Sequence, residues 1–207
     1  MSASEVGHGT ASTATATSSL DQGSLVARAQ DGDLAAFDEL VQRYSSRLYR
    51  YAYSMLGNRQ DAEDALQDTL VRVWRFLPEL TSVDAFGAWT YRALTRQCFT
   101  LLARRRAQRT EAYAADSLAV LADGQRPGPG PTEEDPADHV VSRQRLEELT
   151  RLVHLLPPEQ RACWLLREVQ GHSYGQIAAV LGVPESTVRG RLARARERLA
   201  EGMTSWR

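Results

Sequence analysis

The stretch SYGQIAAVLGVPESTVRGRLARARERL, residues 173–199, predicts two short helices joined by a tight turn. Ser173 and Gln176 fit a capping box, in which each side chain satisfies an orphan hydrogen-bonding group at a helix start. Gly182 suits a left-handed turn, and Pro184 suits the beginning of the next helix. The spacing is that of a helix-turn-helix motif.

The second helix of this motif has two contrasting faces when its residues are placed at about 100° per residue. The apolar face, which we expect to pack inward, consists of Val188, Leu192, Ala195 and Leu199. The opposite face forms a ridge of mostly small residues: Ser186, Gly190, Ala193 and Glu197. The ridge is flanked by Arg189 and Arg196 on one side and by Arg191, Arg194 and Arg198 on the other. Such a helix can lie in a DNA major groove, with the ridge at the base edges and the guanidiniums at the phosphates.

The alternative for this helix is an ordinary solvated basic face. Such a face normally interleaves acidic residues as i,i+4 partners of the basic ones. Residues 187–199 hold five arginines, and only Glu197 is interleaved among them. This pattern favours DNA binding.

The formal net charge of −1 conceals a strong segregation of charge. All 25 basic residues are arginine, which offers bidentate contacts to phosphates and bases. Residues 84–111 contain six arginines and two acids, and the second basic segment is the helix described above. Residues 111–142 contain seven acids and one arginine. The two basic segments therefore indicate acidic partners that the total charge does not reveal.

The periodicity of the chain predicts an all-α fold. Apolar residues recur at three- and four-residue steps, for example from Leu34 to Met55, whereas period-two alternation is absent. Gly57-Asn58 is expected to end that helix. Composition then predicts a disordered tail (1–21), a helical domain (22–110), a flexible acidic Pro/Gly-rich linker (111–139) and a helix-turn-helix domain (140–207).

A second candidate nucleic-acid-binding segment, AFGAWTYRALTRQCFTLLARRRAQR, covers residues 85–109. Aromatic side chains beside arginines can stack on unpaired bases while the arginines follow the backbone. The candidates are Trp89, Tyr91, Arg92, Arg96, Arg104, Arg105, Arg106 and Arg109. The alternative is that Trp89 and Phe86 simply belong to the core.

An acidic stripe precedes this segment and would be repelled by DNA. It consists of Asp61, Glu63, Asp64, Gln67 and Asp68. The functional interpretation is a binding surface for a protein partner. The alternative is a solvated helix face, and composition alone does not separate the two.

Several other functions are disfavoured. Cys98 and Cys163 have no CxxC partner and are expected to be small core residues, and no set of residues has the spacing of a metal or cofactor site. No nucleophile, base and orienting group fall in a recognisable motif, so we do not expect an enzyme. There is neither an apolar run of membrane-spanning length nor a signal peptide, so we expect a cytoplasmic protein without membrane insertion.

From about Gly23 to Leu199 the chain resembles the extracytoplasmic-function (ECF) sigma factors of the sigma-70 superfamily. Residues 62–75, AEDALQDTLVRVWR, are similar to the segment that binds the clamp helices of the largest RNA polymerase subunit. Residues 88–106 resemble the segment that melts and reads the minus-ten promoter element. Residues 156–199 resemble the region that binds the polymerase flap and reads the minus-thirty-five element. The order and spacing of these segments make the resemblance specific.

The resemblance implies a role for each matching residue. The acidic stripe, with Asp64 and Gln67 foremost, would face polymerase. Trp89, Tyr91, Arg92 and the loop from Glu79 to Asp84 would lie at the melted strand, with Arg104, Arg105 and Arg106 at nearby backbone. The upstream element would meet Ser186, Thr187, Arg189, Gly190, Arg191, Arg194 and Arg196. The acidic linker would lie in the channel later used by RNA, and family analogy also allows an anti-sigma protein clamped between the two halves.

Four positions depart from the family pattern. Arg96 stands where the family usually has Asn, Thr100 where it often has Asp, Gln176 replaces Glu, and Gly190 replaces a common Ser. The roles of these positions, and hence the promoter preference, cannot be copied from the family. A stand-alone helix-turn-helix regulator is the second hypothesis, although it leaves the acidic stripe and the linker unexplained. An adaptor that binds only proteins leaves both arginine sets unexplained.

Overall fold

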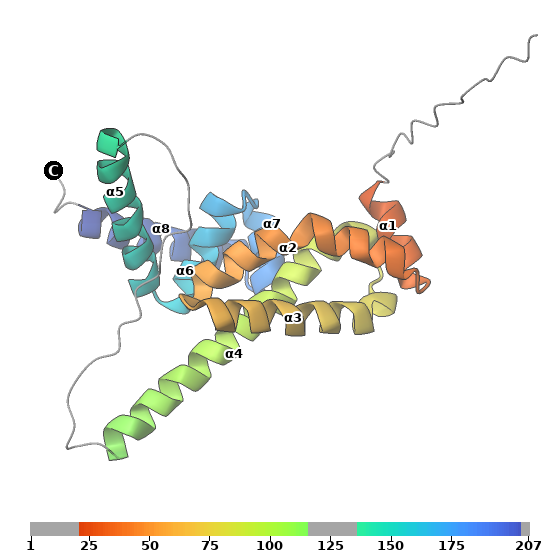
Figure 1. The fold of residues 1–207 in the computed structure, drawn as a ribbon, viewed down its shortest axis with the longest axis horizontal. Helices are drawn as coiled ribbons and strands as arrows, with labels where there is room; N and C mark the ends of the chain where they lie inside the picture. The colour runs from red at the N-terminus through yellow and green to blue at the C-terminus, as the bar shows by residue number, and fades with distance from the viewer. Residues whose placement is uncertain (1–20, 116–135, 204–207) are drawn as a thin grey trace, which may run out of the picture.

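The computed structural model describes residues 21–115 and 136–203 of the 207-residue chain. Within these residues every regular element is a helix, which confirms the all-α prediction (Figure 1). The N-terminal half contains α1 (Gln22–Gln30), α2 (Leu34–Leu56), α3 (Arg59–Phe76), η1 (Leu77–Glu79), η2 (Val83–Ala85) and α4 (Phe86–Ala115). The C-terminal half contains α5 (Pro136–Leu155), α6 (Pro158–Trp164), η3 (Leu165–Val169), α7 (Tyr174–Leu181) and α8 (Glu185–Met203).

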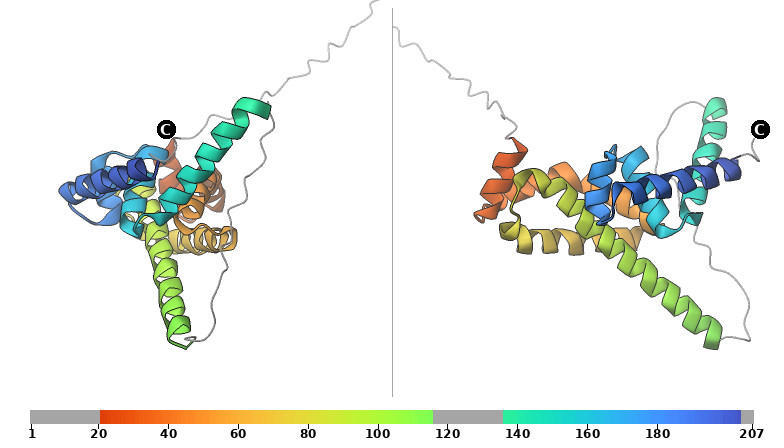
Figure 2. Two further views of the ribbon diagram at one scale, coloured as in Figure 1. Left: turned by 90° about the vertical axis from the view of Figure 1, so that its left-hand side faces the viewer. Right: turned by 180° about the vertical axis from the view of Figure 1, so that it is seen from behind.

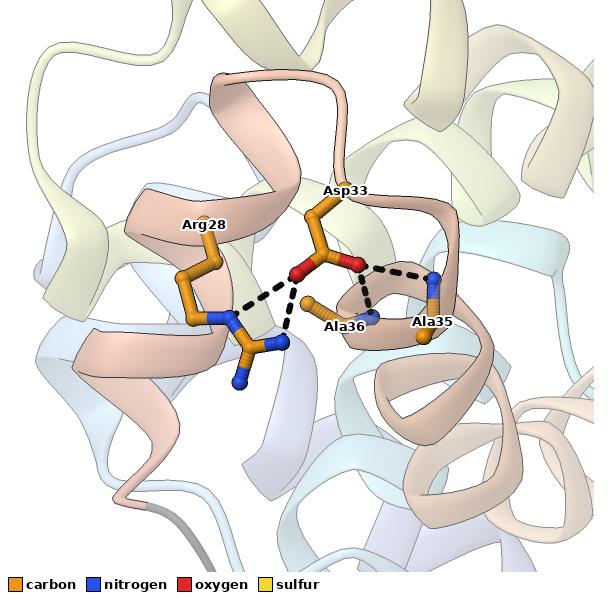
Figure 3. Close-up of polar contacts among 4 residues, drawn as sticks. All are labelled: Arg28, Asp33, Ala35 and Ala36. Carbon is orange, nitrogen blue, oxygen red and sulfur yellow. Dashed lines mark hydrogen bonds and ion pairs between the residues drawn. The ribbon is translucent and has the colours of Figure 1, made fainter.

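A capped turn fixes the angle between α1 and α2. The Asp33 carboxylate accepts hydrogen bonds from the backbone amides of Ala35 (3.0 Å) and Ala36 (3.1 Å), which otherwise have no partner at a helix start (Figure 3). Its other oxygen accepts from Arg28 Nε (2.9 Å) and Nη2 (2.5 Å). The Ala36 amide and then the Arg28 side chain hold the pKa of Asp33 below its ordinary value. The last turn of α1 is thereby tied to the first turn of α2.

The boundary between α2 and α3 lies where the sequence predicts it. Gly57 adopts φ = 68°, in the left-handed region, and its amide donates to the Tyr53 carbonyl. The Asn58 side chain then accepts from the Asp61 amide at 3.0 Å and caps α3. α2 and α3 consequently run side by side, and α4 packs against both (Figure 1).

The two predicted helical domains share a hydrophobic core. A smaller cluster lies wholly in the N-terminal half, with Leu40, Val73 and Phe86 among its members. The larger cluster joins both halves, and includes Tyr51 and Leu94 on one side and Ile177 on the other. α6 and α7 therefore pack against α2 and α4 (Figures 1 and 2).

The helices on both sides extend into the residues predicted as linker. α4 continues to Ala115 and α5 begins at Pro136, whereas we expected the linker to occupy residues 111–139. Proline is tolerated in the first turn of a helix because its missing N–H has no helical partner there. The rest of the linker and the tail up to residue 20 lie outside the described residues. The C-terminal part of α4 projects away from the other helices (Figures 1 and 2).

Candidate nucleic-acid interface

α7 and α8 form the predicted helix-turn-helix. The Ser173 hydroxyl accepts from the Gln176 amide (3.2 Å), and the Gln176 side chain accepts from the Ser173 amide (2.8 Å), so the capping box is complete. Gly182 ends α7 in the left-handed conformation, with φ = 67°. The predicted apolar face of α8 is fully buried: Val188, Leu192, Ala195 and Leu199. Replacement of Glu by Gln at position 176 therefore leaves the cap intact.

The outer face of α8 presents Ser186, Ala193 and most of its arginines to solvent, and two of these arginines have acidic partners other than Glu197. Arg189 pairs with Glu185, one turn earlier (3.1 Å), and Arg196 pairs with Glu168 of η3 (2.7 Å). Glu185 lies two residues before the arginine-rich range 187–199, and Glu168 comes close only through folding. Both pairs are exposed, so each contributes at most about 1 kcal/mol and can exchange its carboxylate for a phosphate.

Arg191 and Arg194 have different surroundings. Arg191 is half-buried and hydrogen-bonds to the Cys163 sulfur, although burial is the larger effect and raises the pKa of that thiol to about 11. Arg194 is exposed, and its Nη1 lies 3.6 Å from the point that a Cβ at position 190 would occupy. The Arg194 guanidinium therefore lies over Gly190. A serine at position 190 would touch it.

Trp89, Arg92 and Arg96 line a cavity of about 400 Å³ between α3, η1 and α4. Its other lining residues are Arg72, Val73, Phe76, Glu79, Leu80, Thr81 and Ala93. Three guanidiniums and two aromatic rings thus surround one groove. Arg72 and Phe76 were not among the predicted residues; an aromatic residue next to Arg75 and two positions before Pro78, at the expected end of a helix, was the available signal.

Tyr91 lies on the opposite side of α4 from this groove. Its side chain is only 3% exposed, and burial raises its pKa to about 12. Residues two apart on a helix point about 200° apart, so Tyr91 cannot share a surface with Trp89. Phe86 is a core residue, as the alternative interpretation held. The sequence grouping of Trp89 with Tyr91 is therefore not a grouping in space.

The arginine cluster further along α4 is also divided. Arg104, Arg106 and Arg109 are exposed on the projecting part of the helix. Arg105 instead forms an ion pair with Asp61 and donates to the Leu56 carbonyl at 3.0 Å. It joins α4 to the end of α2, where the helix dipole is negative.

The acidic stripe splits into two rows. Asp61 and Asp68 face α4, where Asp68 accepts from the Gln97 side chain at 2.9 Å. Glu63, Asp64 and Gln67 remain exposed. The exposed Val71 follows one turn after Gln67, so this outer face of α3 is acidic at one end and apolar at the other. We call Glu63, Asp64, Gln67 and Val71 the outward row.

Comparison with known proteins gives the family of this chain. Residues 40–109 match the family model described as Sigma-70 region 2, and residues 146–199 match that described as Sigma-70, region 4. The chain is 36% identical over 174 residues to the ECF RNA polymerase sigma factor SigE of Mycolicibacterium smegmatis, which covers 82% of this chain and 63% of that one. It is 33% identical over 169 residues to SigM of Mycobacterium tuberculosis, covering 82% and 78%.

A solved structure of a sigma factor resembles this chain over most of its length. The sigma factor RpoE of Bartonella quintana, in complex with the anti-sigma factor NepR, has a TM-score of 0.62 and 25% identity, covering 83% of this chain and 98% of that one. A sigma-70 fold with regions 2 and 4 is thus present, and the chain belongs to the ECF sigma factors of the sigma-70 family. Its function is that of a sigma factor, which directs RNA polymerase to promoters.

The described residues contain no helix that is both long enough and apolar enough to cross a membrane.

Proposed function

We propose that this chain binds core RNA polymerase through the outward row of α3, holds the melted minus-ten strand in the groove of Trp89, and reads the minus-thirty-five duplex with α8. The observation that carries the proposal is the presence of two arginine-lined surfaces of different shape on one chain. One is a hollow with aromatic walls, and the other is a convex helix. Single-stranded and double-stranded DNA call for these two shapes.

The groove suits an unpaired base. A base leaving the duplex needs an aromatic or planar cationic face on which to stack, and Trp89 and the three guanidiniums of the groove supply such faces. Arg96, which stands where the family usually has Asn, also lines this groove. It would therefore still contact the melted strand, but through a charged guanidinium and not through an amide. Arg104 and Arg106 would follow the backbone beyond it.

α8 suits the major groove. Ser186 and Ala193 are exposed, and the neighbouring Thr187 is half-buried. Arg194, lying over Gly190, takes the place nearest to the base edges. Arg189 and Arg196 would leave their exposed carboxylate partners for phosphates, while Arg191 and Arg198 would contact the other wall.

The polymerase contact is assigned to the outward row because its acidic members are exposed. Glu63 is engaged by Arg59, and the Asp64 carboxylate accepts only from Gln60 among the described contacts. The chain is a non-catalytic subunit, so the chemistry remains with the polymerase. An anti-sigma protein is a further partner by analogy with the NepR complex of the Bartonella factor.

Transcription with purified core polymerase tests the proposal. The chain should produce initiated transcript from its promoter, and Asp64→Arg should weaken core binding by about 3 kcal/mol, because it places a like or unpaired charge in the contact. Asp31→Arg is the matched control, since Asp31 is exposed in the turn after α1. Failure to associate with core at low salt, together with tight binding to duplex DNA, would favour the stand-alone regulator instead.

The groove has its own test. Trp89→Ala should weaken binding of a single-stranded minus-ten oligonucleotide by about 1–3 kcal/mol, the contribution of one stacked base. The same substitution should leave duplex minus-thirty-five binding unchanged. The affinity is measured by fluorescence anisotropy with core polymerase present. Equal affinity of the unmodified chain and of Trp89→Ala for the single strand would show that Trp89 is not part of the binding site.

A further inference from the structure

The segment between α3 and α4 forms one wall of the minus-ten groove. Glu79, Leu80 and Thr81 of this segment line the groove together with Trp89 and Arg92 of α4. The segment consists mainly of η1 and η2, which have three residues each. A 3₁₀-helix of this length is weakly held by its own hydrogen bonds, because their geometry is poorer than in an α-helix. The position of this wall therefore depends on contacts with other elements.

A glutamine at the end of α1 binds both ends of η1. The Gln30 Nε2 atom donates to the Leu80 carbonyl at 2.7 Å and to the Leu77 carbonyl at 3.1 Å. Leu77 begins η1 and Leu80 follows it, 47 and 50 residues away from Gln30 in sequence. A side-chain amide nitrogen has two hydrogens to donate, and η1 takes both. Glu79, which lines the groove, lies between the two carbonyls that Gln30 holds.

The smaller hydrophobic cluster joins α1 to the same wall. Its members from α1 are Leu25, Val26 and Ala29. Leu80 and Val83 of the wall pack against this cluster, as does Trp89. Near the start of α1, the point that a Cβ of Gly23 would occupy is 3.6 Å from Val83 Cγ2, so η2 lies close to the backbone of this helix. α1 and the segment between α3 and α4 thus lie side by side at one end of the molecule (Figures 1 and 2).

Nothing in the family match assigns a role to α1. The match to Sigma-70 region 2 begins at residue 40, so α1 and Gln30 lie before it. None of the binding residues predicted from the sequence lies in α1 either. The role of this helix follows from its contacts: it touches both 3₁₀-helices of the wall, one through a polar side chain and the other through apolar packing.

We propose that Gln30 is a positioning residue for recognition of the minus-ten strand, because it fixes η1 and thereby the place of Glu79 and Thr81 in the groove. This role rests on the proposed function of the groove, but the hold on η1 exists without DNA. When Gln30 is lost, the carbonyls of Leu77 and Leu80 take water in place of its amide, and η1 samples other conformations. Affinity for the strand then falls with the fraction of molecules whose groove keeps its shape.

Gln30→Met tests the two hydrogen bonds alone, because methionine is similar in length, favours helices and offers no donor. Hydrogen exchange of the full chain without DNA should become faster at residues 77–85 in this variant and should not change in α8. Gln42→Ala is the matched control, since Gln42 is exposed on α2 and its amide donates to Asp38 of the same helix at 2.8 Å. The control should leave exchange at residues 77–85 unchanged.

The second measurement uses core polymerase and a pool of single-stranded oligonucleotides that is randomised over the minus-ten window. The bound molecules are sequenced, and the unmodified chain and the control should select the same bases. Gln30→Met should bind the selected sequence about three- to tenfold less tightly and should discriminate less between the bases. Its binding to the minus-thirty-five duplex should not change. A merely structural role would lower the binding of every sequence, duplex included, by the same factor.

Unchanged exchange at residues 77–85 in Gln30→Met would overturn the proposal, whatever the binding result. Faster exchange with undiminished base discrimination would overturn it as well, because recognition would then not depend on the wall that Gln30 holds. Gln30→Glu is the second variant if Gln30→Met fails to fold: its carboxylate has the size of the amide but no donor, and the same outcomes apply. If the unmodified chain selects no sequence with core polymerase, the proposed function of the groove fails, and the exchange result still decides whether Gln30 holds η1.

Discussion

The two DNA-binding surfaces proposed for this chain differ in how they are assembled. Two arginines on the outer face of α8 have carboxylate partners that are themselves exposed. The minus-ten groove at Trp89 combines side chains of α3, η1 and α4, whereas Tyr91, on the opposite side of α4, is buried. One surface is built by a single local motif, and the other is assembled from several elements of the N-terminal half. We therefore expect duplex binding to respond to changes within α8, and single-strand binding to respond to changes in α3, η1 and α4.

The largest expected effect comes from Leu192→Ala. Leu192 is buried in the core that both halves share, and truncating a buried leucine costs about 2–5 kcal/mol. Because the core is shared, chemical denaturation followed by circular dichroism should show one transition shifted for the whole chain. Leu34→Ala, at an exposed leucine, should shift it by less than about 0.5 kcal/mol. Two transitions, with only one displaced, would show that the halves do not stabilise each other.

Acid should lower the free energy of unfolding through protonation of His154. Burial, and then the nearby Arg161 charge, lower its pKa from 6.5 to about 4. Between pH 6.5 and 4 the His154 side chain is therefore protonated in the unfolded chain but neutral in the folded chain. The free energy of unfolding is therefore highest above pH 6.5 and falls as the pH drops towards 4. The full shift corresponds to about 3 kcal/mol, and because the His154 ring is only partly buried, solvent screening reduces the expected loss to about 2 kcal/mol. His154→Gln should reduce the pH dependence of the free energy of unfolding between pH 6.5 and 4, leaving the part that comes from His172, whose pKa is also lowered by burial; an unchanged slope would place the titration elsewhere.

Arg194 and Arg191 should separate the two kinds of arginine on α8. Arg194→Ala should weaken binding to the upstream duplex by about 1–3 kcal/mol if its contact is a bidentate base contact. Arg191→Ala should cost a similar amount in binding, and it also removes the hydrogen bond to the buried Cys163 sulfur. Promoter use that is unchanged by both substitutions would contradict the proposed orientation of α8.

The smallest effect is expected from Glu168→Gln. It frees Arg196 from its partner in η3, so duplex binding should strengthen by no more than about 1 kcal/mol. Single-strand binding should not change. A gain for the single strand would mean that Glu168 acts on the minus-ten groove and not on α8.

Local motifs explain what could be predicted from the sequence. Ser173 with Gln176, Gly182, Gly57-Asn58 and the apolar face of α8 each depend on neighbours within a few residues, and all are found as expected. The partners of Tyr91, Arg161 and Arg196 could not be predicted, because they lie 79, 106 and 28 residues away. Helical periodicity says which face is apolar, but a tyrosine on the border between faces is assigned only by what packs on it. Tyr91 was grouped with Trp89 for that reason.

Gly182 shows how closely the two surfaces are coupled. Its left-handed conformation is required by the turn, and its missing side chain leaves the space in which the Arg92 guanidinium rests. A side chain at position 182 would strain the turn and make the Arg92 guanidinium shift by a few tenths of an ångström. A substitution here therefore alters the helix-turn-helix and the neighbourhood of the minus-ten groove together, and an engineer who wants to change one of them alone must look elsewhere on the chain.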